Sequence, residues 1–129
     1  MVVDTSAVLA ILMVEPEERL FANILHRSPI SRLSAASYLE CAMVIDGKGG
    51  MVRRAMLDTF LEEFEITVEP VTFAQAKLAR QALDFFGKGR HPAALNFGDC
   101  FAYALAKSLR EPILFKGTDF SRTDLIAAN

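Results

Sequence analysis

The alternation of short apolar runs with longer stretches of helical periodicity constrains this chain more than any other feature of its sequence. The short runs have the length of strands and occupy residues 1–3, 30–35, 66–71 and 113–115. Apolar residues recur every three or four positions in the stretches between them, at residues 7–14, 16–27, 37–47, 51–64, 73–86 and 98–109. Because strands that alternate with helices form parallel sheets, we expect a single α/β domain over residues 1–129. Its central parallel β-sheet has four to five strands flanked by helices, and residues 124–127 are the candidate fifth strand.

Size and charge exclude some classes of function. A chain of 129 residues can bury a core without disulfides or structural metals. Its 14 basic and 16 acidic residues give a net charge of −2, so it is no polycation. Binding to a nucleic acid would therefore require a local basic patch or bound metal ions. The hydrophobic fraction of 52% is high for a small domain, which suggests that some apolar surface meets a second subunit or another chain.

The cysteines and the N-terminus indicate a protein of a reducing cytoplasm. Cys41 and Cys100 lie in apolar helical patterns and are expected to be buried free thiols. With only two histidines beside them, they do not make a convincing zinc site. The apolar N-terminus lacks a preceding basic segment and is interrupted by Asp4, so we expect neither a signal peptide nor a membrane span.

Four acidic residues follow predicted strands or begin predicted helices. Asp4 follows the first strand, and Glu40 lies in the first turn of the helix after the second strand. Asp99 starts the helix before the last strand, and Asp119 follows that strand. All four positions fall at the carboxyl edge of a parallel sheet, which is where such folds build their sites.

Three of these acids also have a purely local explanation. Glu40 stands three residues after Ser37, which is the spacing of a helix capping box. Asp99 has the same spacing from Asn96, and an acid in the first turn favours the helix dipole. Asp119 fits an ordinary turn. Taken singly, each of these residues leaves both interpretations open.

Asp4 fits a local explanation least well, and the four acids together favour a metal site. A carboxylate between two apolar runs is expected to be desolvated, and a buried charge without a partner is unfavourable. Convergent carboxylates repel one another unless a cation lies between them, and oxygen ligands without Cys or His suit Mg²⁺ or Mn²⁺. Ser6, Asn96 and Thr118 offer neutral oxygens nearby. Two such ions can promote in-line displacement at phosphorus by an activated water.

Four blocks of sequence, in order, resemble the acidic motifs of PIN-domain ribonucleases. The blocks are VVDTSA, SAASYLE, LNFGDCFAYALAK and LFKGTDF, and the similarity is closest to the VapC-type toxins of bacterial toxin–antitoxin pairs. The resemblance covers essentially the whole chain. It implies a PIN-like fold, Mg²⁺- or Mn²⁺-dependent endonucleolytic cleavage of RNA that leaves a 5′-phosphate and a 3′-hydroxyl, homodimerisation, and inhibition by a cognate VapB-type antitoxin.

The resemblance also assigns roles to residues of this chain. It places the catalytic and metal-binding acids at Asp4, Glu40, Asp99 and Asp119, and the assisting hydroxyls at Ser6 and Thr118. Asp124 is a second acid near the last of these positions, so the choice between Asp119 and Asp124 stays open.

The basic loop before the Asp99 helix is a candidate RNA contact. Lys88, Arg90 and His91 lie in this loop, and Lys116 lies close to Asp119 along the chain. Such residues position a strand through its phosphates without reading sequence. The loop fits equally well an ordinary solvated connection.

Two other functions remain possible from the residues alone. A phospho-receiver-like signalling module is also a small α/β sheet with acids and a lysine at one edge, although such a module has paired acids near its first strand and this chain has only Asp4. A metal-dependent DNA nuclease would use the same acids, because recognition of RNA depends on contacts such as those to the 2′-hydroxyl.

Most apolar residues on the helices are expected to pack in the core. This expectation includes Phe73 and Leu83. A few apolar residues are candidates for contact with a dimer mate or an antitoxin, namely Ile11, Met13, Phe21, Met43, Met51 and Met56.

Overall fold

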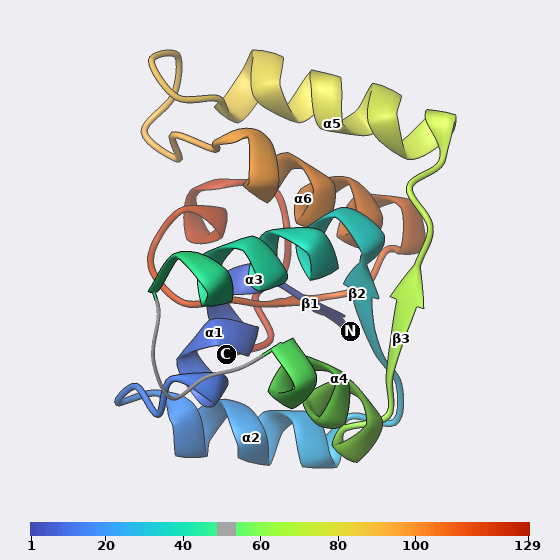
Figure 1. Ribbon diagram of the computed structural model, residues 1–129. Helices are drawn as coiled ribbons and strands as arrows, with labels where there is room; N and C mark the ends of the chain where they lie inside the picture. Colours follow the sequence, from blue (N-terminus) through green and yellow to red (C-terminus); the bar gives the residue numbers. More distant parts are fainter. Residues whose placement is uncertain (49–53) are drawn as a thin grey trace.

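The computed structural model, which describes residues 1–48 and 54–129, contains a central parallel sheet (Figure 1). Its strands run in the order β3-β2-β1-β4, and their bounds are β1 Val2–Val3, β2 Ser31–Ser34, β3 Ile66–Glu69 and β4 Ile113–Leu114. All three neighbouring pairs are parallel. The predicted parallel sheet is confirmed with four strands. The possible fifth strand is reduced to an isolated bridge between Ile113 and Ala127.

Helices connect the strands in the alternating order that the sequence predicts. Their bounds are α1 Thr5–Leu12, α2 Glu18–Arg27, α3 Ala35–Lys48, α4 Arg54–Glu63, α5 Phe73–Phe86 and α6 Phe97–Leu109, with a 3₁₀ turn, η1, at Phe120–Arg122. The first helix begins at Thr5, two residues earlier than predicted, because the Asp4 side chain accepts the backbone N–H of Ser6 and caps it. Gly47 lies inside α3 rather than ending it. The predicted loop at 49–50 and the predicted helical residues 51–53 lie outside the described residues.

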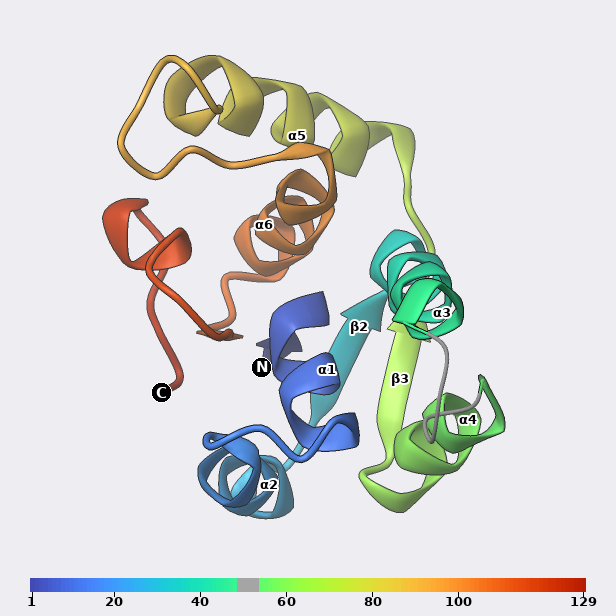
Figure 2. The same cartoon turned by 60° about the vertical axis from the view of Figure 1, so that its left-hand side comes forward.

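Successive strand residues point to opposite faces of the sheet and divide the core in two. Val2 and Ile113 pack with α5 and α6, whereas Val3 and Leu114 pack with α1 to α4. Figure 2 shows α5 and α6 together on one side, with α1, α2 and α4 on the other. The buried residues on either side fix the strand ends, and with them the loops that carry the acids.

Three predictions of which apolar residues are buried and which are exposed are wrong. Phe21 is 1% exposed and packs in the core, so it cannot meet a partner chain. Phe73 and Leu83, predicted to be core residues, are 77% and 46% exposed. The reason is that α5 packs on its neighbours through Leu78, Ala79, Ala82 and Phe86, which leaves these other apolar residues on its outer surface.

Both cysteines are buried and free, as expected. Among the described residues, no helix has the length and apolar character needed to cross a membrane.

Candidate active site

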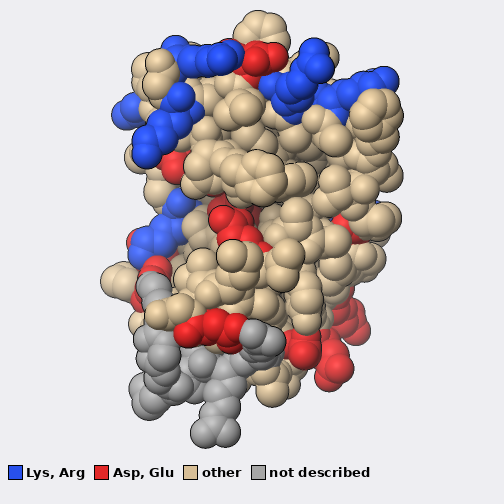
Figure 3. All heavy atoms as spheres, turned by 45° about the horizontal axis from the view of Figure 1, so that its top comes forward, with Lys and Arg blue, Asp and Glu red and all other residues tan. Residues whose placement is uncertain are grey.

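Asp4 lies at the carboxyl end of β1, a central strand, and is 4% exposed. The Ser6 backbone N–H donates to its Oδ2 at 2.9 Å and the Ser6 hydroxyl donates to the same oxygen at 2.5 Å. Desolvation raises the pKa of Asp4, the hydrogen bonds from Ser6 oppose that shift, and the nearby charge of Glu40 adds to it. The predicted desolvation of this carboxylate is therefore confirmed. Figure 3 shows acidic side chains in a recess near the middle of the viewed face.

Glu40 reaches the same region from α3. The Thr5 hydroxyl donates to Glu40 Oε2 at 2.7 Å. The capping-box interpretation of Glu40 is wrong, because α3 already begins at Ala35 and Ser37 lies inside it with a buried hydroxyl that has no hydrogen-bond partner. Gly98 in the first turn of α6 makes room for this carboxylate, since a Cβ there would lie 2.3 Å from Glu40 Oε1.

Asp99 combines a structural role with a strongly perturbed carboxyl group. Its Oδ2 accepts the Asn96 backbone N–H at 2.8 Å, and Asn96 Oδ1 accepts the Asp99 backbone N–H at 3.0 Å. The predicted capping box is thus present. The pKa of Asp99 is nevertheless raised to about 6, chiefly by desolvation and further by the charges of Asp4, Asp119 and Glu40. The helix cap therefore leaves Asp99 within reach of the charges of the three other acids.

The two candidate acids after β4 lie in different surroundings. Asp119 is exposed, precedes η1, and is close enough to Asp99 for its charge to raise the Asp99 pKa. Asp124 accepts hydrogen bonds from Tyr103 and Lys107. Desolvation of Asp124 is outweighed by these two donors, which hold its pKa below the usual value. The geometry therefore favours Asp119 over Asp124 as the fourth acid. We call Asp4, Glu40, Asp99 and Asp119 the acidic cluster.

Of the assisting residues, Ser6 is firmly held and Thr118 is not. The Ser6 hydroxyl donates to Asp4 and accepts the Lys116 backbone N–H at 3.0 Å, so its orientation is fixed. Thr118 is exposed and accepts a hydrogen bond from Ser121 through its backbone carbonyl. The Asn96 side chain caps α6.

Three of the four basic candidates are already engaged with other residues. Arg90 pairs with Asp84 at 3.0 Å. His91 Nδ1 accepts a backbone N–H from Ala93 at 3.1 Å, and its ring packs edge-on against Phe86. Lys88 is exposed and forms no ion pair with a described residue.

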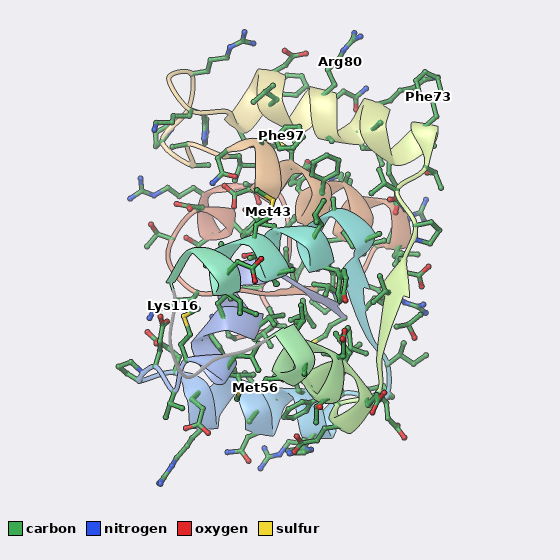
Figure 4. All side chains as sticks on the ribbon, in the orientation of Figure 1. Met43, Met56, Phe73, Arg80, Phe97 and Lys116 are labelled. Carbon is green, nitrogen blue, oxygen red and sulfur yellow. The ribbon has the colours of Figure 1, made fainter. Side chains whose placement is uncertain are left out.

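Lys116 pairs with acids outside the cluster. Its Nζ lies 2.7 Å from Glu15 Oε2 and 2.9 Å from Glu17 Oε2, so it neutralises the turn between α1 and α2. Lys116 and its two partners tie this turn to the loop that carries Asp119. Figure 4 shows Lys116 at the edge of the molecule near α1 and α2.

The acidic cluster suits a hard divalent cation in its chemistry. Its side-chain donors are all oxygens, and none of them forms an ion pair with a residue in the ranges 1–48 and 54–129. Within those ranges no three His, Cys, Asp or Glu side chains form a ready group of metal ligands. Thr5, Ser6 and the Asn96 N–H hold three of the carboxylates in hydrogen bonds. The donor set and the repulsion that raises the Asp99 pKa fit Mg²⁺ or Mn²⁺.

Sequence reasoning missed two residues of this site. Thr5 was available as a hydroxyl in VVDTSA, but only the fold brings it to Glu40, 35 positions away. Gly98 stands directly before Asp99, and its lack of a side chain is visible in the sequence. The structure shows why this matters, because a Cβ at this position would collide with the Glu40 carboxylate.

Comparison with known proteins identifies the family of this chain. The family model of the PIN domain matches residues 1–126. Ribonuclease VapC28 of Mycobacterium tuberculosis is 53% identical over 124 residues, which cover 95% of this chain and 93% of the relative. Ribonuclease VapC of Mycolicibacterium smegmatis is 45% identical over 129 residues, which cover 100% of both chains.

Solved structures share the fold at low sequence identity. The crystal structure of Mycobacterium tuberculosis VapC20, a sarcin–ricin loop cleaving toxin, has a TM-score of 0.78 at 16% identity and covers 97% of this chain and 95% of its own. A toxin–antitoxin complex from Klebsiella pneumoniae has a TM-score of 0.72 at 12% identity and covers 99% and 97%. The family match and the close relatives favour a nuclease over the phospho-receiver-like module. The chain therefore belongs to the PIN-domain family, within which it is a ribonuclease of the VapC toxin group.

Proposed function

We propose that this protein cleaves RNA phosphodiester bonds with Mg²⁺ or Mn²⁺ held by Asp4, Glu40, Asp99 and Asp119. The observation that carries the proposal is the raised pKa of the Asp99 carboxyl group beside three other acids. Its pKa of about 6 is raised by desolvation and by the three other acids, and no described lysine or arginine pairs with the cluster. A bound divalent cation would supply an activated water and would stabilise charge at phosphorus.

The residues around the cluster orient its oxygens and tune their charge. Ser6 holds Asp4 Oδ2 with two donors, and Thr5 holds Glu40 Oε2. Burial keeps Asp4 away from bulk water, which strengthens its interaction with a cation. The N-terminus of α6 carries Asp99 in its first turn, so the positive end of this helix dipole lies beside the acidic cluster.

We also propose a VapB-type antitoxin as a partner, a homodimer as the assembly and the cytoplasm as the location. The Klebsiella pneumoniae toxin–antitoxin complex, which has the same fold, supports the antitoxin. A groove of about 610 Å³ between α1, α2 and α4 is a suitable place for it. Its floor is apolar and it contains Glu18 and Glu63, so it suits an amphipathic segment with basic residues. Met56, one of the residues predicted to face a partner, lines this groove.

Cleavage mapping tests the catalytic proposal most simply. Purified protein is incubated with total RNA, and with single-stranded DNA of matched length, in Mg²⁺, Mn²⁺ or a chelator. Wild type is expected to cut RNA at defined positions only with a divalent ion, and Asp99→Asn is expected to lose cleavage. Asp124→Asn is the matched control and is expected to retain it. Cleavage that persists in chelator, or in Asp99→Asn, contradicts the proposal, and cleavage of DNA alone favours a DNA nuclease.

A further inference from the structure

Two exposed phenylalanines on α5 and α6 have no role in the core or in the acidic cluster. Phe73 begins α5 and is 77% exposed, and Phe97 begins α6 and is 81% exposed. Exposed apolar rings that gather on one face mark a binding surface more often than chance. Figure 4 shows Phe73 and Arg80 projecting from α5, with Phe97 below that helix at the start of α6.

These rings line two adjoining hollows. The first, of about 320 Å³, lies between α5 and α6, and Phe97, Phe101 and Arg80 are among its walls. The two rings meet edge to face with centroids 4.9 Å apart, so Phe101 supports Phe97 from behind. The second hollow, also about 320 Å³, lies along α5 and is lined in part by Phe73 and Lys77. Ala76 and Arg80 belong to both hollows, so the two form one continuous track.

The charge of the track is positive and unneutralised. Lys77 Nζ lies 4.7 Å from the centroid of the Phe73 ring, and neither Lys77 nor Arg80 forms an ion pair with a described residue. None of the described residues that line either hollow is acidic. Lysine and arginine side chains gather along the upper edge of the face in Figure 3, beyond the acidic recess. The groove between α1, α2 and α4 differs from this track, because two glutamates line it.

The first turn of α6 joins the track to the acidic cluster. Phe97, Cys100 and Phe101 lie on the side of this helix that faces the hollow, with the spacing of one helix face. Gly98 and Asp99 lie on the side that meets Glu40 and the other acids. Cys100 lines the hollow and directly follows Asp99 in α6, so the wall of the hollow adjoins the acidic cluster.

We propose that this track binds the single-stranded RNA that flanks the cleaved bond, with one base stacked on Phe97, a neighbouring base stacked on Phe73, and the phosphate between them held by Arg80. The assignment rests on the proposed RNA cleavage and names the path of its substrate. Aromatic rings alternating with basic side chains are the surface that single strands recognise, because every base has a flat face and every linkage has a negative charge. The phosphates that continue the path meet Lys77 and, after α5, the unpaired Lys88.

A second copy of this chain is the other occupant that such an apolar face could take. The charge argues against it, because a two-fold contact through the track would set Arg80 and Lys77 against the same positive surface of the second copy, and none of the described residues that line the two hollows is acidic. RNA supplies the missing negative charge with every nucleotide.

Binding in the absence of metal tests the track separately from catalysis. The full chain, in chelator, is titrated against a fluorescein-labelled single-stranded RNA and against an abasic oligomer of the same length, and anisotropy is measured over a range of salt concentrations. The variants are Phe97→Leu and Arg80→Gln. Phe85→Leu is the matched aromatic control, because Phe85 is 70% exposed and lines neither hollow. Arg19→Gln is the matched charge control, since Arg19 is an exposed residue of α2. Light scattering gives the mass of each variant.

The expected pattern differs between the two ligands. Phe97→Leu weakens binding of the RNA about ten-fold and leaves the abasic oligomer unaffected, since stacking needs a base. Arg80→Gln weakens both and lowers the slope of log affinity against log salt by about 0.7, the value for one phosphate contact of a single strand. Both controls bind like wild type.

Two outcomes would overturn the assignment. One is wild-type RNA affinity in both track variants, and the other is a loss of affinity that occurs only together with a dimer-to-monomer change, which would assign the face to a second copy. Because cleavage plays no part in this assay, a failure of the track leaves the metal-dependent reaction to its own test.

Discussion

Replacing Asp99 by asparagine is expected to stabilise the protein when no metal is present. The carboxyl group has a pKa of about 6 in the folded chain against 3.8 in a free side chain, so its ionisation opposes folding. A difference of about two units corresponds to an upper limit of ~3 kcal/mol. Asp99 is partly exposed, and solvent screening reduces this figure to about 1–2 kcal/mol. Loss of its favourable interaction with the α6 dipole offsets about 0.5 kcal/mol, which leaves a gain of ~1 kcal/mol in the free energy of unfolding.

The sign of the pH dependence follows from the raised pKa. Below pH 3.8 the group is protonated in both folded and unfolded chains, so the penalty is absent. The penalty grows as the pH rises through the window from 3.8 to about 6 and is complete above it. The advantage of Asp99→Asn should therefore be full at pH 7 and vanish near pH 4. The asparagine Oδ1 can still accept the Asn96 N–H, so the helix cap survives.

Thermal unfolding in chelator, followed by circular dichroism at pH 7 and pH 4, measures this effect. The melting temperature of Asp99→Asn should exceed that of wild type by roughly 3–5 °C at pH 7. Asp124→Asn is the control of opposite sign, because Tyr103 and Lys107 outweigh desolvation and lower the pKa of Asp124, and its loss should destabilise the fold at pH 7. A variant at position 99 that melts below wild type at pH 7, or whose advantage is equal at both pH values, would refute the electrostatic reasoning.

The remaining predictions concern the residues that hold the acids in place. Gly98→Ala places a methyl group 2.3 Å from Glu40 Oε1, so RNA cleavage in Mn²⁺ should fall about 10- to 100-fold as that carboxylate is displaced. Gly47→Ala, in open space on α3, should stabilise the fold by about 0.5–1 kcal/mol in chemical denaturation and leave cleavage unchanged. Lys116→Met should lower the cleavage rate, because the ion pairs with Glu15 and Glu17 that anchor the Asp119 loop are lost. Lys116→Arg keeps the positive charge and should retain most of the wild-type rate. Equal rates for Gly98→Ala and Gly47→Ala, or for the two Lys116 variants, would argue against these roles.

The strands and the acid positions could be predicted because they depend on local pattern. Short apolar runs separated by helical periodicity specify a parallel sheet, and the positions just after its strands share one edge. Asp4 stands directly after such a run, and its burial follows from that placement. The Asn96–Asp99 capping box is equally local, since three positions separate its members.

The contacts that the sequence did not reveal join residues far apart in the chain. The pairing of Lys116 with Glu15 spans 101 positions, and no local pattern announces it. The hydrogen bonds from Tyr103 and Lys107 to Asp124 favour Asp119 in a choice that spacing alone left open. Periodicity also cannot tell which apolar face of a helix meets the core, which is why the exposure of Phe73 was missed.

Binding of Mn²⁺ to the RNA-free protein tests the central claim most directly, and electron paramagnetic resonance measures it without any cleavage. Wild type at pH 7 should bind the ion, Asp4→Asn and Asp99→Asn should each weaken binding at least about ten-fold, and Asp124→Asn should not. Wild-type affinity should also fall as the pH is lowered through about 6, where Asp99 takes up its proton. Equal Mn²⁺ affinity in wild type, Asp4→Asn and Asp99→Asn would contradict the account.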